Sequence, residues 1–392
     1  MMAKEILIVS NYFPPETGAA SNRIFLLAEI LKQYNYSPKV VSPLPNYPNG
    51  KIFSGYRRKL FFTEIYKGIK VDRLLLLASN STNKIIRLLS MLSFSLNLFF
   101  FIILKKTAPV YIIQCSPLLV GFFAVIAAKL KGKNIILNVS DLWPRAGLEM
   151  GILNKGWYYD ILLYMESYIY NNSDKIMGQS KEILTHVKSN LSKHEKPLLL
   201  YRNFPVFDRP KIKSEREISK FKIVYAGLLG VAQGIESIIK NINLPKGFEL
   251  HIYGNGPMSS QVKDICKENS QLFYHGLLKR EELHETLVNY DATLIPLKNR
   301  IYGSVPSKIF EYSKLGLPII YFSDGEGADI VEKFNLGITQ RQIDYNLLEI
   351  KLQQLSKNEI ELPKKEHIQK TAYENFNVYN QFKNLQKKLF YQ

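Results

Sequence analysis

The chain has 392 residues, 46% of them hydrophobic and 22% charged, a balance that is ordinary for a folded protein and excludes extensive disorder. The chain is longer than a domain with a single hydrophobic core usually is, so we expect two domains. Only two cysteines occur, Cys115 and Cys266, and neither has the neighbouring histidines or cysteines of a zinc site. They argue against a disulfide framework and are typical of a reducing cytoplasm.

The net charge of +18 is spread unevenly along the chain. Residues 1–200 hold 25 basic and 12 acidic side chains, a net of +13, whereas residues 201–392 hold 27 and 22, a net of +5. Residues 51–133 alone hold 14 basic and 2 acidic side chains. Nucleic acid and anionic lipid are both candidate partners for such a surface.

The chain begins with the apolar run Ile6–Val9, which Pro14 and Pro15 soon follow. A short apolar run that ends before prolines predicts a buried strand and its loop, not a secretion signal. We therefore expect a cytoplasmic protein.

Strand-like runs alternate with helical patterns along the first half of the chain. We predict strands at Ile6–Ser10, Lys39–Ser42, Val110–Gln114 and Asn134–Val139. Helices between them include Ser21–Tyr34 and Leu118–Lys129. Strands separated by helices indicate a parallel α/β sheet with crossover connections.

Residues 88–104 form a strongly apolar segment, with Arg87 before it and Lys105 and Lys106 after it. Seventeen residues that include several serines are short and polar for a membrane-spanning helix. A buried helix of the first domain, a helix in the membrane interface and a spanning helix all stay open. The basic flanks favour lipid over nucleic acid, because no aromatic-basic recognition motif is visible. The residues that we assign to a membrane face are Arg87, Phe94, Phe99, Lys105 and Lys106.

The alternating pattern breaks at Asn203–Ser214, a segment that contains two prolines. We place the two domains at residues 1–208 and 209–392, each a doubly wound, Rossmann-like unit, facing each other across a cleft. The last stretch, Tyr373–Tyr391, has a helical pattern and is a candidate to cross back to the first domain.

The second half repeats the alternation of strands and helices. Strands are predicted at Phe221–Tyr225, Glu249–Tyr253, Ala292–Pro296 and Pro318–Phe322. Helices are predicted at Ile235–Lys240, Ser259–Glu268, Arg280–Asn289 and Ser307–Leu315.

Three loops that contain glycine follow predicted strands and open helices. In parallel sheets, ligands bind at such carboxyl ends, where backbone N–H groups can approach a diphosphate. Glycine turns of this kind also connect strands and helices in proteins where they bind no ligand. The residues concerned are Gly18 in the loop 14–21, Gly227, Gly230 and Gln233 in the loop 226–234, and Gly254 and Gly256 in the loop 254–257.

A fourth loop carries charged residues. Pro306 and Ser307 are a start signal for a helix, whose free N–H groups favour an anion. Lys308 adds a positive charge there, and Glu311 lies one turn further along a similar face. A carboxylate at that position can accept hydrogen bonds from ribose hydroxyls. A Lys–Glu pair on a solvated face is the alternative.

Several of these segments, in this order, resemble the family-4 retaining glycosyltransferases of the GT-B fold, and most closely the subgroup that builds bacterial O-antigen, capsule and colanic acid. The resemblance covers nearly the whole chain, and its more specific elements are 141–144 (Asp-Leu-Trp-Pro) and 306–308 (Pro-Ser-Lys). It implies a nucleotide-sugar donor, with acceptor binding in the first domain and donor binding in the second.

The chain departs from these relatives at two places. Many relatives carry two glutamates with seven residues between them, but here only Glu311 matches and the first position is Gly303. Many also carry Arg and Lys in the loop where this chain has Leu228, Leu229 and Gln233. Lys308 is therefore our candidate to meet the diphosphate. The sequence contains no Asp-x-Asp pair, so we expect a mechanism without metal or other cofactor.

These observations together predict retaining transfer of a hexose or N-acetylhexosamine from a nucleotide-diphosphate sugar to a polyprenyl-diphosphate-linked saccharide. Gly18, Asp141 and Lys308 are the candidate catalytic residues. Asp141 contacts the sugar or the acceptor in this interpretation, and in the alternative it is a plain helix N-cap. A nucleotide-sugar 2-epimerase and a non-catalytic partner subunit of the same fold are the competing functions. The expected location is the inner face of the cytoplasmic membrane, bound peripherally to anionic lipid.

Overall fold

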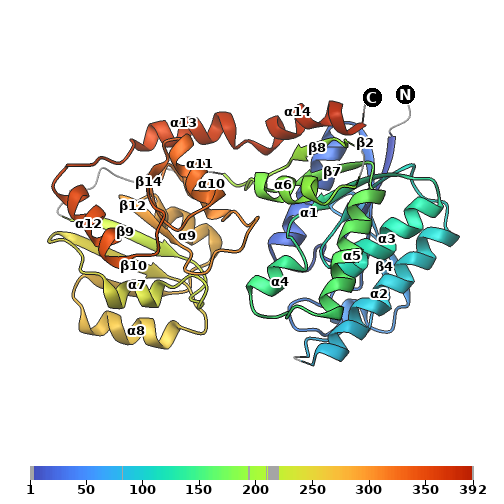
Figure 1. Ribbon diagram of the computed structural model, residues 1–392, viewed down its shortest axis with the longest axis horizontal. Coiled ribbons are helices and arrows are strands. Elements are labelled where there is room, and N and C mark those ends of the chain that lie inside the picture. The colour runs from blue at the N-terminus through green and yellow to red at the C-terminus, as the bar shows by residue number, and fades with distance from the viewer. Residues whose placement is uncertain (1–3, 82, 193–194, 209, 211–219, 391–392) are drawn as a thin grey trace. The chain divides into compact units, whose positions relative to one another are not determined.

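The computed structural model describes residues 4–81, 83–192, 195–208, 210 and 220–390, and the chain divides into two compact units (Figure 1). The first unit comprises residues 1–202 and 379–392, and the second comprises residues 203–378. The boundary thus lies six residues before the expected one at 208, and the end of the chain belongs to the first unit. Part of the expected boundary segment, residues 209 and 211–219, lies outside the described residues.

The first unit is built on a sheet with the strand order β3-β4-β2-β1-β5-β6-β7-β8. Neighbouring strands are parallel except β3 and β4, which form an antiparallel hairpin that the sequence pattern did not predict. The four strands predicted in this half all form. The bounds are β1 (Lys4–Val9), β2 (Tyr36–Pro43), β3 (Phe61–Tyr66), β4 (Ile69–Leu74), β5 (Val110–Gln114), β6 (Asn134–Val139), β7 (Lys175–Gly178) and β8 (Leu198–Leu200).

Helices cover both faces of this sheet. Helices α2, α3 and α5 lie side by side as one outer layer (Figure 1), joined by ring contacts such as Phe99–Phe123 and Phe122–Tyr168. The helices of the unit are α1 (Ala19–Gln33), α2 (Lys84–Leu104), α3 (Leu118–Leu130), α4 (Arg145–Glu149), α5 (Trp157–Asn172), α6 (Lys181–Ser189) and α14 (Val378–Phe390).

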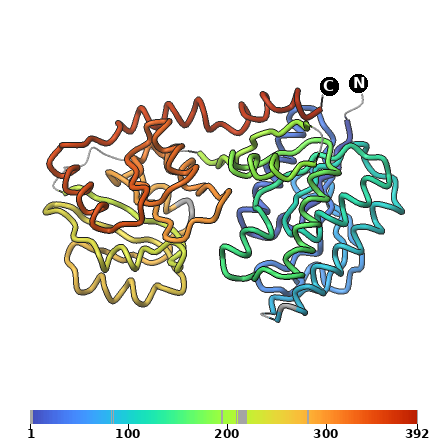
Figure 2. Tube along the Cα trace, in the orientation of Figure 1, coloured from blue at the N-terminus to red at the C-terminus, as the bar shows by residue number. Residues whose placement is uncertain are grey.

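The last helix, α14, packs on the first unit, so both ends of the described chain lie there (Figure 2). The ring of Phe382 lies 5.2 Å from that of Tyr34, and the ring of Phe390 lies 4.5 Å from that of Tyr36. Lys175 also donates a hydrogen bond to the carbonyl of Leu389, at 2.9 Å. The predicted return of the terminal helix to the first domain is confirmed.

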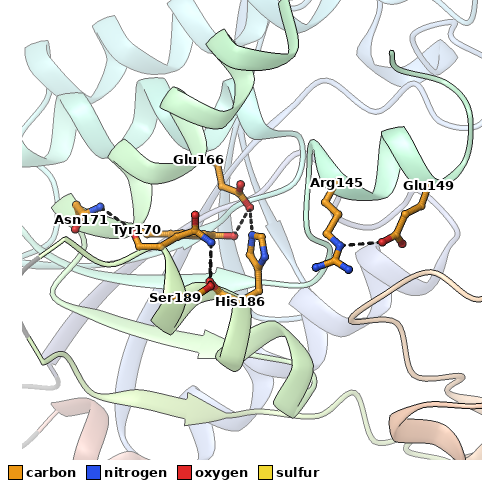
Figure 3. A network of polar contacts seen from close by, with 8 residues as sticks. Arg145, Glu149, Glu166, Tyr170, Asn171, His186 and Ser189 are labelled. Carbon is orange, nitrogen blue, oxygen red and sulfur yellow. Dashed lines mark hydrogen bonds and ion pairs between the residues drawn. The ribbon is translucent and has the colours of Figure 1, made fainter. Parts of the chain in front are cut away.

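A buried polar cluster joins α5 to α6 (Figure 3). The carboxylate of Glu166 is 1% exposed, accepts a hydrogen bond from the Tyr170 hydroxyl at 2.9 Å, and lies 3.0 Å from His186 Nε2. Burying a carboxylate costs much free energy unless it has such partners, so this cluster is a structural element of the unit.

The second unit has a parallel sheet in the order β11-β10-β9-β12-β13-β14. One apolar core lies between its strands and the helices that include α7, α8 and α12. Its elements are β9 (Phe221–Ala226), α7 (Ile235–Asn241), β10 (Phe248–Tyr253), α8 (Ser259–Glu268), β11 (Leu272–Gly276), α9 (Arg280–Leu287), β12 (Ala292–Pro296), α10 (Lys308–Leu315), β13 (Ile319–Phe322), α11 (Glu326–Lys333), β14 (Gly337–Gln340), α12 (Tyr345–Ser356) and α13 (Lys365–Asn375).

Candidate functional site

Two glycine loops meet at the carboxyl ends of β9 and β10 in the second unit. The strand register pairs Tyr253 with Ala226, so the loops that follow begin side by side. Gly227 N donates to Tyr253 O at 2.9 Å. Gly254 has a φ of +140°, and a Cβ atom there would overlap the Gly227 carbonyl oxygen. Glycine is therefore required at 254, both by its backbone angle and by the close approach of the two loops.

Two buried tyrosine hydroxyls donate hydrogen bonds to backbone carbonyls of the loop 226–234. Tyr225 donates to the carbonyl of Leu228 at 2.6 Å, and Tyr312 on α10 donates to the carbonyl of Ala226 at 2.8 Å. The bond from Tyr312 ties the middle of α10 to the loop 226–234. The structure therefore brings the predicted residues of the second unit into one region.

Lys308 lies beneath this loop. A Cβ atom at Gly227 would overlap the Lys308 ammonium, which also lies 5.2 Å from the centre of the Tyr225 ring and 5.7 Å from that of Tyr312. Burial lowers the pKa of Lys308 from 10.5 to about 8, and the charge of Glu311 partly opposes this shift. The solvated-face interpretation of Lys308 is therefore wrong.

Glu311 lies one turn after Lys308, and its carboxylate Oε1 is 2.7 Å from His284 Nε2 on α9. The His284 side chain is 7% exposed and that of Glu311 is 20% exposed. His284 was not predicted from the sequence, because 27 residues separate it from Glu311.

The remaining predicted donor residues surround the same loops. Ser307 is the N-cap residue of α10, directly after Pro306, and the first hydrogen bond of the helix runs from Ile309 N to Pro306 O at 3.1 Å. Gln233 places its buried Oε1 against Gly230, with no hydrogen bond to it found in the described part of the chain.

Further glycine and lysine contacts complete this region. A Cβ atom at Gly256 would lie 2.5 Å from the Leu229 carbonyl oxygen, so a third glycine allows close loop packing. Lys298, which the sequence did not single out, packs on Gly234 and donates to Ser237 Oγ at 3.2 Å. It adds a second cation beside the loop 226–234.

In the first unit, Gly18 precedes α1 and ends a tightly held loop. The carboxylate of Glu16, which is 2% exposed, accepts hydrogen bonds from Asn46 N at 2.8 Å and Tyr47 N at 2.9 Å. Arg73, which is fully buried, donates to the carbonyl of Pro14. These contacts hold the backbone that leads into α1 in one conformation.

Asp141 is exposed in the turn after β6 and accepts a long hydrogen bond from Ser116 Oγ, at 3.4 Å. The N-cap of α4 is Pro144, so the N-cap interpretation of Asp141 is wrong. Arg23 on α1, which the sequence analysis did not single out, interacts electrostatically with Asp141. Burial lowers the pKa of Arg23, and Asp141 opposes that shift.

Helix α2 is apolar on both its buried and its exposed face. Phe94 is fully buried, as are Leu98 and Ile102, so its prediction as a membrane residue is wrong. Phe99 is half-buried against the ring of Phe123. The sequence could not show the orientation, because a helix that is apolar all round has no polar face to mark the outside.

The opposite face of α2 forms an exposed apolar stripe at helical spacing. Its members are Ile85, Ile86, Leu89, Leu96, Phe100 and Leu104, and Arg87, Lys105 and Lys106 beside them are also exposed. The interpretation as a fully buried helix is therefore wrong. In the described chain, Ile85–Leu104 is the one stretch long and apolar enough to span a membrane by length and composition, and 28% of it is buried inside the protein.

Helix α5, in the same outer layer, adds exposed aromatic side chains that the sequence analysis missed. Trp157 is 76% exposed and Tyr164 is 66% exposed. Lys131 and Lys133 lie near the end of α2, since they donate to the carbonyls of Ile103 and Thr107 at 3.0 and 3.3 Å. Apolar and basic groups thus occur together on the outer layer of the first unit.

Comparisons with known proteins identify the second unit and the fold. Residues 208–375 match the family model described as "Glycosyl transferases group 1". No curated protein matches the sequence significantly. The chain is similar to the solved structure of sucrose-phosphate synthase from Thermosynechococcus elongatus, with 14% identity, 99% of each chain covered and a TM-score of 0.70.

Two other similar structures are the lipopolysaccharide outer core galactosyltransferase WaaB and HepE of Anabaena in complex with UDP. Each has 13% identity and a TM-score of 0.68, with 98% of this chain and 99% of that chain covered. Residues 208–375 therefore form a group 1 glycosyltransferase domain, and the chain has the GT-B fold.

Proposed function

We propose that this chain transfers a sugar, with retention, from a nucleotide-diphosphate sugar to a polyprenyl-diphosphate-linked saccharide of a bacterial surface polysaccharide. The observation that carries the donor half is the packing of Lys308 beneath Gly227, with Glu311 one turn further along α10, inside a group 1 glycosyltransferase domain. The lipid-linked acceptor rests on the apolar and basic outer layer of the first unit.

The chemistry follows from charge. As the bond between the sugar C1 and the diphosphate oxygen breaks, its electron pair goes to the diphosphate. The Lys308 ammonium and the N-terminus of α10 would stabilise that charge without a metal ion. The acceptor hydroxyl forms the new bond to C1 on the same face, and its proton goes to the departing diphosphate. Gly18 and Asp141 would contact the transferred sugar or the acceptor.

A panel of nucleotide sugars, each with and without a lipid-linked acceptor, tests this proposal. We expect nucleotide release that depends on the acceptor and persists in EDTA. Interconversion of the sugar without an acceptor would instead show an epimerase. No turnover of any donor would leave a non-catalytic partner subunit. UDP-sugars come first in the panel, because the similar structure of HepE contains UDP.

We further propose that the exposed stripe of α2 docks in the interface of an anionic membrane, at the inner face of the cytoplasmic membrane. Charge complementarity supports this choice, because residues 51–133 hold 14 basic and 2 acidic side chains. Each basic residue near an anionic surface adds about 1 kcal/mol, and each large apolar side chain buried in lipid adds about 1.5–3 kcal/mol.

Vesicle co-sedimentation checks this docking. We expect the wild type to pellet with anionic vesicles at low salt and to be loosened by high salt, because exposed charges are screened over about 10 Å at 0.1 M. Replacing Ile85, Leu89 and Phe100 with glutamine should reduce the bound fraction at least about tenfold.

Glutamine at three exposed apolar residues of the second unit, Leu277, Ile350 and Tyr373, is the matched control and should bind like the wild type. A wild type that stays in the supernatant with anionic vesicles at low salt would contradict membrane docking. Equal loss in both triple variants would mean that α2 has no special role.

A further inference from the structure

We propose that His284 is a positioning residue for Glu311, and that this pair makes the second unit select nucleotides with a 2′-hydroxyl. The inference rests on the proposed function, because it takes the ribose of the donor as the partner of Glu311. It adds a residue that nothing in the sequence pattern marks.

The geometry of the pair defines what the imidazole does. His284 Nε2 lies 2.7 Å from Glu311 Oε1. A carboxylate oxygen at this distance accepts a hydrogen bond, so Nε2 carries a proton whether the ring is neutral or charged. Hydrogen bonds to an ionised acceptor are short and strong, so this bond restricts the rotation of the Glu311 side chain.

The imidazole is itself held in place. The ring of Phe207 lies 4.3 Å from the His284 ring, centre to centre, and the planes are inclined by 39°. Lys314 on α10 donates to the Phe207 carbonyl at 2.6 Å and lies 4.5 Å from the centre of the Phe207 ring. Phe207, His284 and Glu311 thus form a chain of contacts that returns to α10.

This arrangement matters for recognition because an ordered carboxylate loses little side-chain entropy when a ligand binds. A carboxylate has about four acceptor positions, so a bond to His284 is compatible with further bonds from a ribose. A pair of neighbouring hydroxyls can donate to one fixed carboxylate, whereas a 2′-deoxyribose lacks one of these donors. Fixing Glu311 should therefore increase discrimination as well as affinity.

Calorimetric titration with UDP and with 2′-deoxy-UDP tests the inference, with GDP and its 2′-deoxy form as a second pair. His284→Leu should weaken UDP binding about tenfold and reduce the preference for UDP over 2′-deoxy-UDP. His284→Gln keeps an N–H donor near the position of Nε2, and we expect it to retain most of the affinity. In a Glu311→Gln background, His284→Leu should cause little further loss.

The outcomes separate the two levels of the proposal. Equal losses for His284→Leu and His284→Gln, or additive losses in the double variant, would reduce His284 to a packing residue and overturn the inference. The preference ratio is measured on folded protein, so partial unfolding of a variant does not mimic its loss. If the wild type binds UDP and the His284 variants do not differ from it, only the inference fails. Wild type that binds no nucleoside diphosphate would overturn the proposed function as well.

Discussion

A Lys308→Met protein is expected to turn over its donor at least about a hundredfold more slowly than the wild type, yet to unfold at a higher temperature. Methionine matches the length of lysine but cannot stabilise the charge that develops on the departing diphosphate. In the free protein, burial lowers the pKa of Lys308 to about 8, which means that its surroundings disfavour the ammonium. Removing the charge should stabilise the free protein by an amount on the order of 1–3 kcal/mol at pH 7.

The lowered pKa of Lys308 also fixes the sign of a pH dependence. The unfolded lysine keeps its proton up to about pH 10.5, whereas the folded one loses it near pH 8. The destabilising effect is therefore complete below pH 8 and disappears as the pH rises towards 10.5. The stability advantage of Lys308→Met should shrink between pH 7 and 10, which thermal denaturation measures.

Nucleotide affinity should follow the charge on Lys308. UDP binding to the wild type is expected to weaken about tenfold between pH 7 and pH 9, because the charged fraction of a group with a pKa near 8 falls by that factor. Binding to Lys308→Met should be weak and nearly independent of pH. Unchanged turnover in Lys308→Met, or the same pH dependence in both proteins, would remove Lys308 from the donor site.

The second large effect concerns the two glycine loops. Gly254→Ala should destabilise the protein by about 3 kcal/mol and abolish UDP binding, because its Cβ would overlap the Gly227 carbonyl at a strained φ of +140°. Gly227→Ala should lower the free energy of unfolding much less, because the atom that its Cβ would overlap is the flexible end of Lys308. It should nevertheless weaken UDP binding, since the ammonium must move.

Chemical denaturation and UDP titration of both alanine variants measure these effects. Gly247→Ala is the matched control, because Gly247 has a φ of +85° but open space around its Cβ position. A Gly254→Ala protein as stable as Gly247→Ala would show that the two loops are not packed as described. A Gly227→Ala protein with wild-type affinity would separate Lys308 from nucleotide binding.

Local patterns were enough to predict the sheets, and the eight strands predicted from sequence all form. The strands that were missed include β7 and β8, which are only four and three residues long, and the hairpin of β3 and β4. Strand β3 has no buried residue, and β4 carries the charged residues Lys70, Asp72 and Arg73, so neither forms a continuous apolar run. The start of α10 was also predictable, since Pro306 and Ser307 are local signals. Phe94 was misplaced because an apolar helix does not reveal which of its faces is buried.

Contacts between distant segments escaped prediction for a different reason. The bond between His284 and Glu311 depends on how α9 packs beside α10, and the position of Arg23 near Asp141 depends on the sheet order. Neither relation has a signature within a window of the sequence. The four candidate loops were found because each one contains glycine or proline within a short window of the sequence.

The return of α14 to the first unit has a consequence for how the protein is made. A ribosome synthesises the first 202 residues long before residues 379–390, yet Phe382 and Leu389 belong to the buried interior of that unit. During synthesis, the first unit therefore lacks α14, and Tyr34 and Tyr36 stay uncovered until the whole second unit has been synthesised. A chain that stops before residue 379 leaves this surface open to chaperones and proteases, so the first unit is complete only after the second unit has been synthesised.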